Sequence, residues 1–476
     1  MGQTTIFEML YPTFKIDKPI RLIELFAGYG SQALALKYLG VDFEHWKICE
    51  WAVKSIQAYK DIHFTDDDTD YFIQQPFKDD WLISWLYEKG ISNNYNEPMT
   101  KEQIIRLGEN QRKKIYNNIC STHNLVNIQQ VKGKNLEICD TDEYCYIMTY
   151  SFPWQDLSLA GKGKGMSDTS TRSGMLWEVE RILTECKELG TLPQVLLMEN
   201  VPQVHSADNV EDFNKWQLRL EELGYKNYWQ DLIATDYGIP QTRNRTFMVS
   251  ILGDYNYTFL KPIPLKLKLK DMLEDEVDEK YFLSDKMKEY IFSENDKYKV
   301  NKSSLKLNRD IACSKTTREG NTRADTSDYI LVKNATKKGY LEATDGDGID
   351  ISSRMEHHRG TVQKDKAQTL TTQCDRGVVI GTYQYSKSDK FMQGRDRLQL
   401  GKETSDTLQT TPKEGIVNGD LKIRKLTPKE CFRLMGVKDE DFEKVKKNQS
   451  DSSLYHLAGD SIVVNVLMAI FKEMIE

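Results

Sequence analysis

Short apolar runs alternate with amphipathic stretches from Arg21 to about Gly253. This rhythm is typical of repeated strand–helix units, so it predicts a largely parallel sheet with helices packed on it. The first unit is the clearest. Residues 21–26 are predicted to form a strand, and Ser31 is predicted to cap a helix that runs to Leu39, where a glycine ends it.

Two further buried strands are predicted at residues 146–148 and 195–198, and each ends where polar residues begin. In an open α/β sheet, ligands bind beyond the carboxyl ends of the strands. We therefore expect the chemistry of this protein to lie at the polar residues that follow these strands.

The strand–helix rhythm fails after Gly253, where a segment rich in Thr, Lys, Asp and Gly follows. Residues 369–379 and 407–417 in this segment resemble each other, and each is typical of a strand that enters a turn. The repeat is interpreted either as a hairpin without function or as a scaffold that presents loops to a partner. Helical periodicity then returns, with helices predicted at residues 428–434 and 462–475.

A polar, acid-rich insertion lies between His63 and His123. Its aspartate runs, such as residues 66–68, are typical of a solvated surface. We interpret the insertion as a solvated decoration on the edge of the sheet.

The composition, 39% hydrophobic and 29% charged, is that of a folded globular protein. The longest nearly apolar run, residues 462–471, is about half the length of a membrane-spanning helix, and no secretory signal is visible. We therefore expect a cytoplasmic protein with no membrane partner. The eight cysteines form no C-x-x-C pair, so free thiols and no metal are expected.

Charge is distributed unevenly along the chain. The net charge is −7, but residues 301–430 hold 24 Lys and Arg against 18 Asp and Glu, a balance of +6 that leaves −13 for the remainder. A basic segment on an acidic body is a weak indication that one part of the molecule meets a polyanion.

The turn Gly28-Tyr29-Gly30 lets the backbone approach a ligand between the first strand and its helix. Glu50 follows about twenty residues later, at the end of an apolar run, where a carboxylate can accept hydrogen bonds from ribose hydroxyls. Trp51 beside it offers a flat face to an adenine. Together these residues predict an adenosine cofactor, although the glycines alone could form only a tight turn.

Glu199 comes directly after the buried strand at residues 195–198, so burial could raise its pKa and suit it to proton donation. The alternative is a carboxylate paired with an arginine. Arg243 and Arg245 could supply that arginine, and their alternation in an extended segment places both on one face.

These features resemble the motifs of the DNA (cytosine-5) methyltransferases, and they occur in the order of that family. The resemblance extends from Arg21 to Phe471, apart from the insertion and the middle of the basic segment. The matching motifs are Glu24-Leu-Phe-Ala-Gly-Tyr-Gly30, Ser151-Phe-Pro-Trp-Gln-Asp-Leu-Ser158, Arg172-Ser-Gly-Met-Leu-Trp177, Glu199-Asn-Val201, Gln241-Thr-Arg-Asn-Arg245, Arg424-Lys-Leu-Thr-Pro428 and Gly459-Asp-Ser-Ile-Val463.

The resemblance implies an α/β fold, in which a Rossmann-like S-adenosylmethionine-dependent methyltransferase domain carries a smaller, mostly β target-recognition domain. The expected divisions are an N-terminal extension at 1–20, a cofactor-binding and catalytic domain at 21–260 with the insertion at about 63–123, a recognition domain at 261–420, and a segment at 421–476 that completes the catalytic domain. It further implies that the cofactor is S-adenosylmethionine and that the partner is double-stranded DNA.

In the family's reaction a cysteine thiolate attacks C6 of a flipped-out cytosine while a glutamate serves N3, and C5 then takes the methyl group. By position, the resemblance gives Glu199 the role at N3, Arg245 a contact to the base, and Arg243 a place near the phosphate. The cysteine position is Trp154. The cofactor-binding positions are Phe26, Ala27, Gly28, Gly30, Glu50, Trp51, Asn127, Ile128, Asp460, Ser461 and Ile462.

Trp154 departs from the family pattern because indole is neither nucleophilic nor ionisable in water. We expect the chain as written to lack the covalent step. Two interpretations stay open: an active enzyme altered at one codon, or a natural non-catalytic protein that binds DNA and S-adenosylmethionine. Lesser departures are Asn127 in place of the usual Asp, and Asp460 in place of the usual Asn.

Two rival classes explain less of the sequence. A transfer-RNA methyltransferase of the same lineage is disfavoured by the long, internally repeated segment before Arg424. A nicotinamide oxidoreductase would explain Gly28 and Glu50, but nothing at Glu199 or Arg245.

A modification enzyme of bacterial or phage type is expected to act as a monomer, with a partner restriction endonuclease at the same DNA site.

Overall fold

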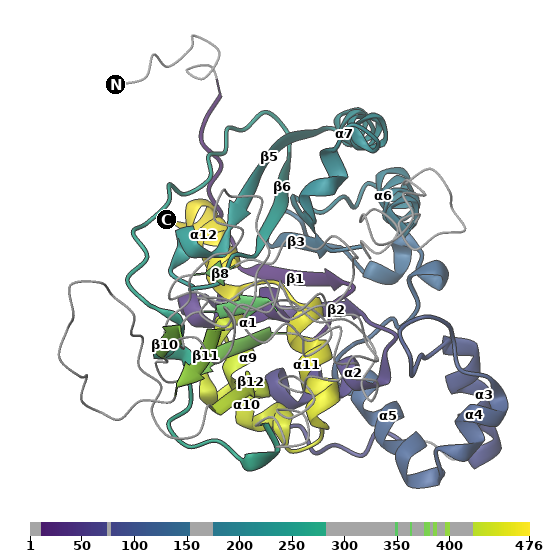
Figure 1. Ribbon diagram of the computed structural model, residues 1–476. Coiled ribbons are helices and arrows are strands. Elements are labelled where there is room, and N and C mark those ends of the chain that lie inside the picture. Colours follow the sequence, from purple (N-terminus) through teal and green to yellow (C-terminus); the bar gives the residue numbers. More distant parts are fainter. Residues whose placement is uncertain are drawn as a thin grey trace.

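The structure is a computed structural model that describes residues 11–73, 78–152, 175–281, 348–350, 362–363, 376–380, 384–387, 396–399 and 422–476. Its main body is one six-stranded sheet covered by helices on both faces (Figure 1). The strands of this sheet are β1 (Ile20–Leu25), β2 (Phe43–Cys49), β3 (Cys145–Tyr150), β4 (Val195–Asn200), β5 (Tyr225–Ile233) and β6 (Asn244–Leu252).

The strand order is β2-β1-β3-β4-β6-β5. Strands β1 to β4 are parallel, as the strand–helix rhythm predicts, whereas β6 runs antiparallel to both β4 and β5. The reason is local: only residues 234–243 join β5 to β6, which is too short for the crossover that a parallel pair needs.

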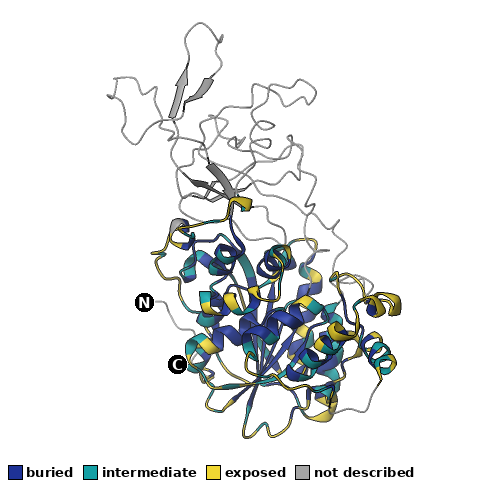
Figure 2. Ribbon diagram, turned by 90° about the horizontal axis from the view of Figure 1, so that it is seen from below, coloured by how far each residue is buried: buried dark blue, intermediate teal, exposed yellow. Residues whose placement is uncertain are grey.

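Alternate residues of the central strands face two separate cores. Ile147 and Leu197 enter the core on one face of the sheet, whereas Met148 and Met198 enter the core on the other. The first face is covered by α1 (Ser31–Leu39) and α12 (Val464–Ile475), and the second by α6 (Leu176–Leu189) and α7 (Val210–Leu223). Figure 2 shows the resulting buried interior. Because both faces are covered, these strands are continuously apolar.

Helix α1 ends where the sequence predicts, but its N-cap is Gly30 and not the predicted Ser31, whose side chain makes no capping hydrogen bond. It begins at Ser31, after Gly30 at φ 82°, and ends at Leu39, where Gly40 adopts φ 72° and donates its N–H to the carbonyl of Lys37. The turn formed by residues 26–30 therefore lies between the carboxyl end of β1 and the start of α1.

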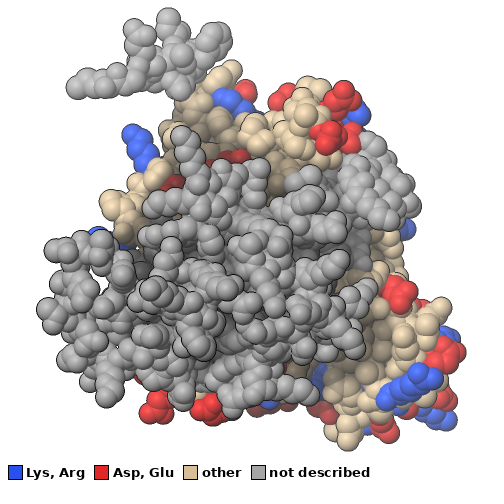
Figure 3. Space-filling view, viewed as in Figure 1, with Lys and Arg blue, Asp and Glu red and all other residues tan. Residues whose placement is uncertain are grey.

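The insertion is not the solvated decoration that its aspartates suggest. It contains α3 (Asp79–Lys89), α4 (Lys101–Arg106) and α5 (Glu109–Ser121), which follow α2 (Val53–His63). Their apolar residues form a separate core that also takes in Ile56 of α2 and the partly buried Trp51. The acids remain at its outside, where Lys, Arg, Asp and Glu intermingle at the lower right of Figure 3, and Asp79 pairs with the buried Arg112.

The C-terminal segment returns to the main body. It contains α9 (Pro428–Leu434), α10 (Asp439–Lys446), α11 (Asp451–Asp460) and α12. Thr427 caps α9 in a reciprocal capping box with Glu430. The stretch Asp451–Ile475 is apolar and long enough to cross a membrane by composition, but 72% of its apolar window is buried inside the molecule, as in a core helix.

Strands of two small antiparallel sheets are described in the basic segment: β12-β9-β7-β8, and the pair β10-β11. They are β7 (Gly348–Asp350), β8 (Val362–Gln363), β9 (Arg376–Ile380), β10 (Gln384–Lys387), β11 (Asp396–Gln399) and β12 (Lys422–Lys425). β9 overlaps the first copy of the internal repeat, whereas residues 407–417 lie outside the described residues. Short 3-10 helices are η1 (Ile128–Gln130), η2 (Gly133–Leu136), η4 (Pro202–His205), η5 (Ala234–Tyr237), η6 (Leu269–Met272) and η7 (Glu279–Tyr281).

Candidate cofactor and catalytic site

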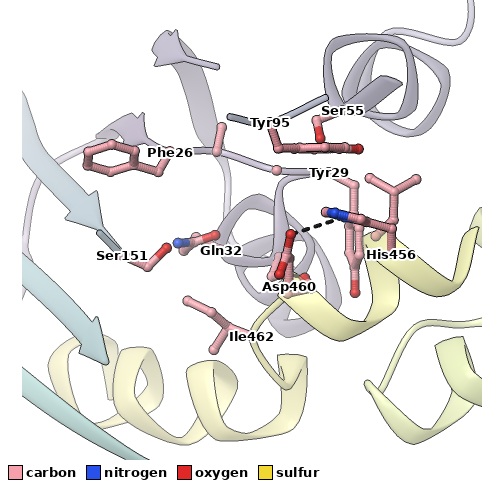
Figure 4. Close-up of a pocket in the computed structure, with 14 residues that line it drawn as sticks. Phe26, Tyr29, Gln32, Ser55, Tyr95, Ser151, His456, Asp460 and Ile462 are labelled. Carbon is pink, nitrogen blue, oxygen red and sulfur yellow. Dashed lines mark hydrogen bonds and ion pairs between the residues drawn. The ribbon is translucent and has the colours of Figure 1, made fainter. Parts of the chain in front are cut away.

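A pocket lies where the β1–α1 turn, the start of α2, the end of β3 and the end of α11 meet (Figure 4). It therefore lies at the carboxyl end of the parallel strands, where ligands of α/β sheets bind. Its lining residues are Phe26, Ala27, Gly28, Tyr29, Ser31, Gln32, Ser55, Tyr95, Ser151, His456, Leu457, Asp460, Ser461 and Ile462.

The β1–α1 turn is held by Glu50. One carboxylate oxygen accepts the N–H of Gly28 at 2.9 Å, and the other accepts the N–H of Ala52 at 2.7 Å. Burial raises the pKa of Glu50 to about 7, although these two backbone hydrogen bonds oppose the rise. Glu50 thus lies behind the turn that lines the cavity and fixes its shape.

Gly30 completes the turn and has no room for a side chain. Its φ is +82°, and a Cβ atom there would lie 2.3 Å from Nε2 of His63. That ring nitrogen is itself 3.0 Å from the carbonyl oxygen of Tyr29. The G-x-G pattern therefore reflects both a left-handed backbone and close packing by α2.

The opposite side of the cavity comes from the C-terminal segment. The hydroxyls of Ser461 and Ser31 are hydrogen-bonded, which joins the end of α11 to the start of α1. Oδ2 of Asp460 lies 3.0 Å from Nδ1 of His456, one helical turn earlier. A carboxylate, hydroxyls and backbone groups thus converge on one space.

Glu199 and Arg245 form a buried ion pair at the carboxyl end of β4. Nε of Arg245 lies 3.1 Å from Oε1 of Glu199. Burial raises the pKa of Glu199, and the positive charges of Arg245 and Arg243 oppose the rise. Both sequence alternatives for Glu199 therefore hold at once: the carboxyl has a raised pKa, and it is paired with an arginine.

Arg243 turns toward the C-terminal segment. Its Nη2 donates to the carbonyl of Gly459 at 3.1 Å and to that of Ser461 at 2.6 Å. Burial and the charge of Arg245 lower the pKa of Arg243 to about 9. In this structure Arg243 thus joins the start of β6 to the end of α11, and its place near a phosphate stays a prediction.

The start of the catalytic motif is anchored to the same strand end. Nδ2 of Asn200 donates to the carbonyl of Phe152 at 3.2 Å. Trp154 itself, with the rest of residues 153–174, lies outside the described residues. The first residue of that motif, Ser151, nevertheless lines the cavity.

The expected cofactor residues divide into two groups. Phe26, Ala27, Gly28, Asp460, Ser461 and Ile462 line the cavity, and Gly30 and Glu50 support it. The other group does not line the cavity and consists of Trp51, Asn127 and Ile128. Trp51 packs on the core of the insertion, and Ile128 lies in the core beneath α6. The side chain of Asn127 accepts the N–H of Gln129.

The sequence analysis missed several lining residues, among them Tyr95, Gln32 and His456. His456 lies four residues before Asp460 in a helix, so helical spacing could have found it, and Gln32 lies in the first turn of the helix that follows the predicted glycine turn. Tyr95 had no such signal because it belongs to the insertion.

The cavity lies at the carboxyl ends of parallel strands, the position at which open α/β sheets bind their ligands, and the buried Glu199–Arg245 pair lies at the end of a neighbouring strand. The C-5 cytosine-specific DNA methylase family matches residues 96–476, and the chain belongs to this family. The predicted family is thereby confirmed, as is its assignment as a DNA (cytosine-5) methyltransferase.

Among its relatives, the type II methyltransferase M2.ScrFI of Lactococcus lactis subsp. cremoris is 29% identical over 462 residues, covering 96% of this chain and 99% of the relative. The orphan methyltransferase M.SssI of Spiroplasma monobiae is 36% identical over 298 residues, covering 60% of this chain and 74% of the relative.

Two solved structures share the fold. The Entamoeba histolytica methyltransferase EhMeth aligns with a TM-score of 0.51 at 13% identity, covering 96% of this chain and 98% of that one. A mutant of Spodoptera frugiperda DNMT2 aligns with a TM-score of 0.50 at 16% identity, covering 96% and 99%. The predicted α/β methyltransferase fold is therefore confirmed.

Proposed function

We propose that this chain is built to transfer a methyl group from S-adenosylmethionine to C5 of a flipped-out cytosine in a specific double-stranded DNA sequence, and that Trp154 makes it inactive as written. The observation that carries the proposal is the buried Glu199–Arg245 pair, with 3.1 Å between Oε1 and Nε. It lies at the end of β4, the neighbour of β3, and Ser151 directly after β3 lines the cavity.

The side chains that line the cavity suit the chemistry of the proposed cofactor. S-adenosylmethionine, when bound, supplies an electrophilic methyl group on a sulfonium that also carries an amino acid and a ribose. The Asp460 carboxylate can attract the cationic groups, while Gln32 and the hydroxyl of Ser461 can hydrogen-bond with the polar ones.

Glu199 is proposed to protonate N3 of the cytosine or to hydrogen-bond with it. Its raised pKa favours the protonated carboxyl, which can donate a hydrogen bond to N3 and so make the ring a better electron acceptor at C6. Arg245 keeps the carboxyl in place and is proposed to orient the base. Arg243 supports both from behind through its bonds to Gly459 and Ser461.

The missing part is the nucleophile. An indole at position 154 cannot form the bond to C6 that the reaction requires, and positioning by other groups does not replace a covalent step. The same observation favours a second candidate, a non-catalytic protein that binds DNA and S-adenosylmethionine.

Tritium transfer from S-adenosylmethionine to duplex DNA separates the two. The unaltered chain should transfer nothing, and Trp154→Cys should transfer readily. Trp154→Ala is the matched control, because it removes the indole without adding a thiol. A silent Trp154→Cys protein that still binds DNA and cofactor would favour the non-catalytic candidate. Transfer by the unaltered chain would refute the assignment of position 154.

The target and partners need their own measurements. Bisulfite sequencing of DNA exposed to Trp154→Cys would reveal the methylated sequence, and a transfer-RNA arm would test the rival substrate. We further propose that the protein is cytoplasmic and monomeric. Light scattering of the purified protein would test the monomeric state. A restriction endonuclease that cuts the same sequence is the proposed partner, and protection of methylated DNA against it is the corresponding assay.

A further inference from the structure

The insertion reaches the cavity through one tight loop, residues 91–99, which we call the Tyr95 loop. Its main chain is fastened beside Glu50, since Ser92 donates its N–H to the carbonyl of Trp51 at 2.7 Å and accepts the N–H of Val53 at 2.9 Å. The loop is therefore held against the same segment that shapes the β1–α1 turn.

The loop is also rigid within itself. Oδ1 of Asn94 accepts the N–H groups of Asn96 at 2.9 Å and of Glu97 at 3.2 Å, and Oγ of Ser92 donates to the carbonyl of Glu97 at 2.8 Å. At its tip, Tyr95 has φ +62°. A left-handed backbone is unfavourable for a tyrosine and persists only where the surroundings enforce it.

The strained backbone aims the Tyr95 ring at the end of α11. The ring stacks on the imidazole of His456, with centroids 3.9 Å apart and planes 14° from parallel. His456 in turn pairs with Asp460 at 3.0 Å. Figure 4 shows Tyr95 and His456 one above the other on one side of the cavity, with Phe26 on the far side.

We propose that Tyr95, with His456 and Asp460, forms a cofactor-binding wall contributed by the insertion, and that this wall holds the amino-acid half of S-adenosylmethionine. The inference rests on the proposed cofactor. An aromatic ring beside a carboxylate is a favourable environment for a cation, here the ammonium of the amino acid.

The position of the cavity favours this half of the cofactor over the adenine. Ser151, three residues before the nucleophile position, lines the same cavity. The sulfur that bears the methyl must face position 154, and both the amino-acid chain and the ribose are attached to it. The Asp460 carboxylate in the same cavity favours the cationic amino-acid chain over the uncharged adenosine. One face of Tyr95 is already covered by His456, which leaves no sandwich for an adenine between the two rings.

Calorimetry with three probes tests the wall in the full-length chain: S-adenosylmethionine, S-adenosylhomocysteine, and methylthioadenosine, which lacks the amino acid. Tyr95→Asn removes the ring, but asparagine tolerates a left-handed backbone, so the loop should keep its shape. It should weaken binding of the first two probes about fivefold to tenfold and leave methylthioadenosine unchanged.

Two controls accompany it. Tyr95→Phe keeps the ring and should bind within about twofold of the unaltered chain. Tyr87→Ala removes an exposed tyrosine of the same insertion that does not line the cavity, and should change nothing. If Tyr95→Asn and the unaltered chain bind S-adenosylmethionine with equal affinity, the role of Tyr95 is overturned but the proposed cofactor is not. Equal weakening for methylthioadenosine would overturn the assignment to the amino-acid half. No binding by the unaltered chain would overturn the proposed cofactor itself.

Discussion

Three buried carboxylates at or near the strand ends have clearly raised pKa values. Glu24 in β1, Glu50 after β2 and Glu199 in β4 are all buried, and burial raises the pKa of each. Each is also held by specific donors, such as the Tyr59 hydroxyl and the N–H of Ala33 at Glu24. These groups consequently couple protonation to folding and to binding.

Stability should fall with rising pH because of Glu24. Its pKa rises from 4.5 to about 7 on folding, so its contribution is complete below about pH 4.5 and is lost as the pH rises to about 7. The loss is about 3 kcal/mol at most. Glu24→Gln should therefore show a smaller difference in unfolding midpoint between about pH 5 and about pH 8. The exposed Glu222→Gln should retain the full difference, and an unchanged difference in Glu24→Gln would contradict the assignment.

Glu50 should matter for the cofactor through the turn that it holds. Glu50→Ala leaves the N–H groups of Gly28 and Ala52 without their acceptor, and should weaken S-adenosylmethionine binding by about 1–3 kcal/mol in calorimetry. Glu50→Gln can still accept one of the two hydrogen bonds and should lose less. Equal affinity of all three chains would show that the turn keeps its shape without the carboxylate.

At the scale of helices and strands, local signals succeeded where one segment determines its own structure. The limits of α1 follow from its capping glycine, and α9 begins at Pro428 as predicted because a proline suits the first helical turn. The antiparallel β5–β6 pair and the core of the insertion were missed, since both depend on partners distant in sequence.

The same contrast holds within the site. Residues of the G-x-G turn and of the C-terminal motif could be predicted, because each stands at the end of a recognisable element. Tyr95 could not, because its position depends on the docking of Ser92 against Trp51 and Val53, which no local pattern reveals.

Between α9 and α12 the chain packs so closely at Gly436 that one added methyl group should lower the stability of the protein. Gly436 has φ +78°, and a Cβ atom there would lie 2.4 Å from Oδ1 of Asn465. Gly436→Ala should therefore destabilise the protein by about 2–4 kcal/mol, measured as the free energy of unfolding. Gly40→Ala is the matched control: φ is +72°, but nothing lies within 4 Å, so about 1–2 kcal/mol is expected. Equal losses would mean that Asn465 yields freely.

At the scale of the whole molecule, the charge is separated between a body of −13 and the segment 301–430 of +6. A molecule of this kind can bind a polyanion while its overall charge is negative, because binding depends on the local field.

DNA binding should accordingly depend steeply on salt. Each phosphate that a Lys or Arg neutralises releases counterions, so a protein with about six phosphate contacts loses roughly a thousandfold in affinity between about 50 and 200 mM salt. Fluorescence anisotropy with a labelled duplex would measure this for the unaltered chain. Affinity that stays constant over this range would exclude the basic segment as the main DNA contact.

The hydrogen bond between Ser31 and Ser461 joins residues 430 positions apart. At about 5–20 residues per second, a ribosome takes roughly 20–90 s to pass from the first serine to the second. Throughout that time the nascent chain has a glycine turn but only half of a pocket, and the helix that covers α1 is the last to be made. We therefore expect the proposed cofactor to bind only after α11 has been synthesised, because that helix supplies one wall of the pocket.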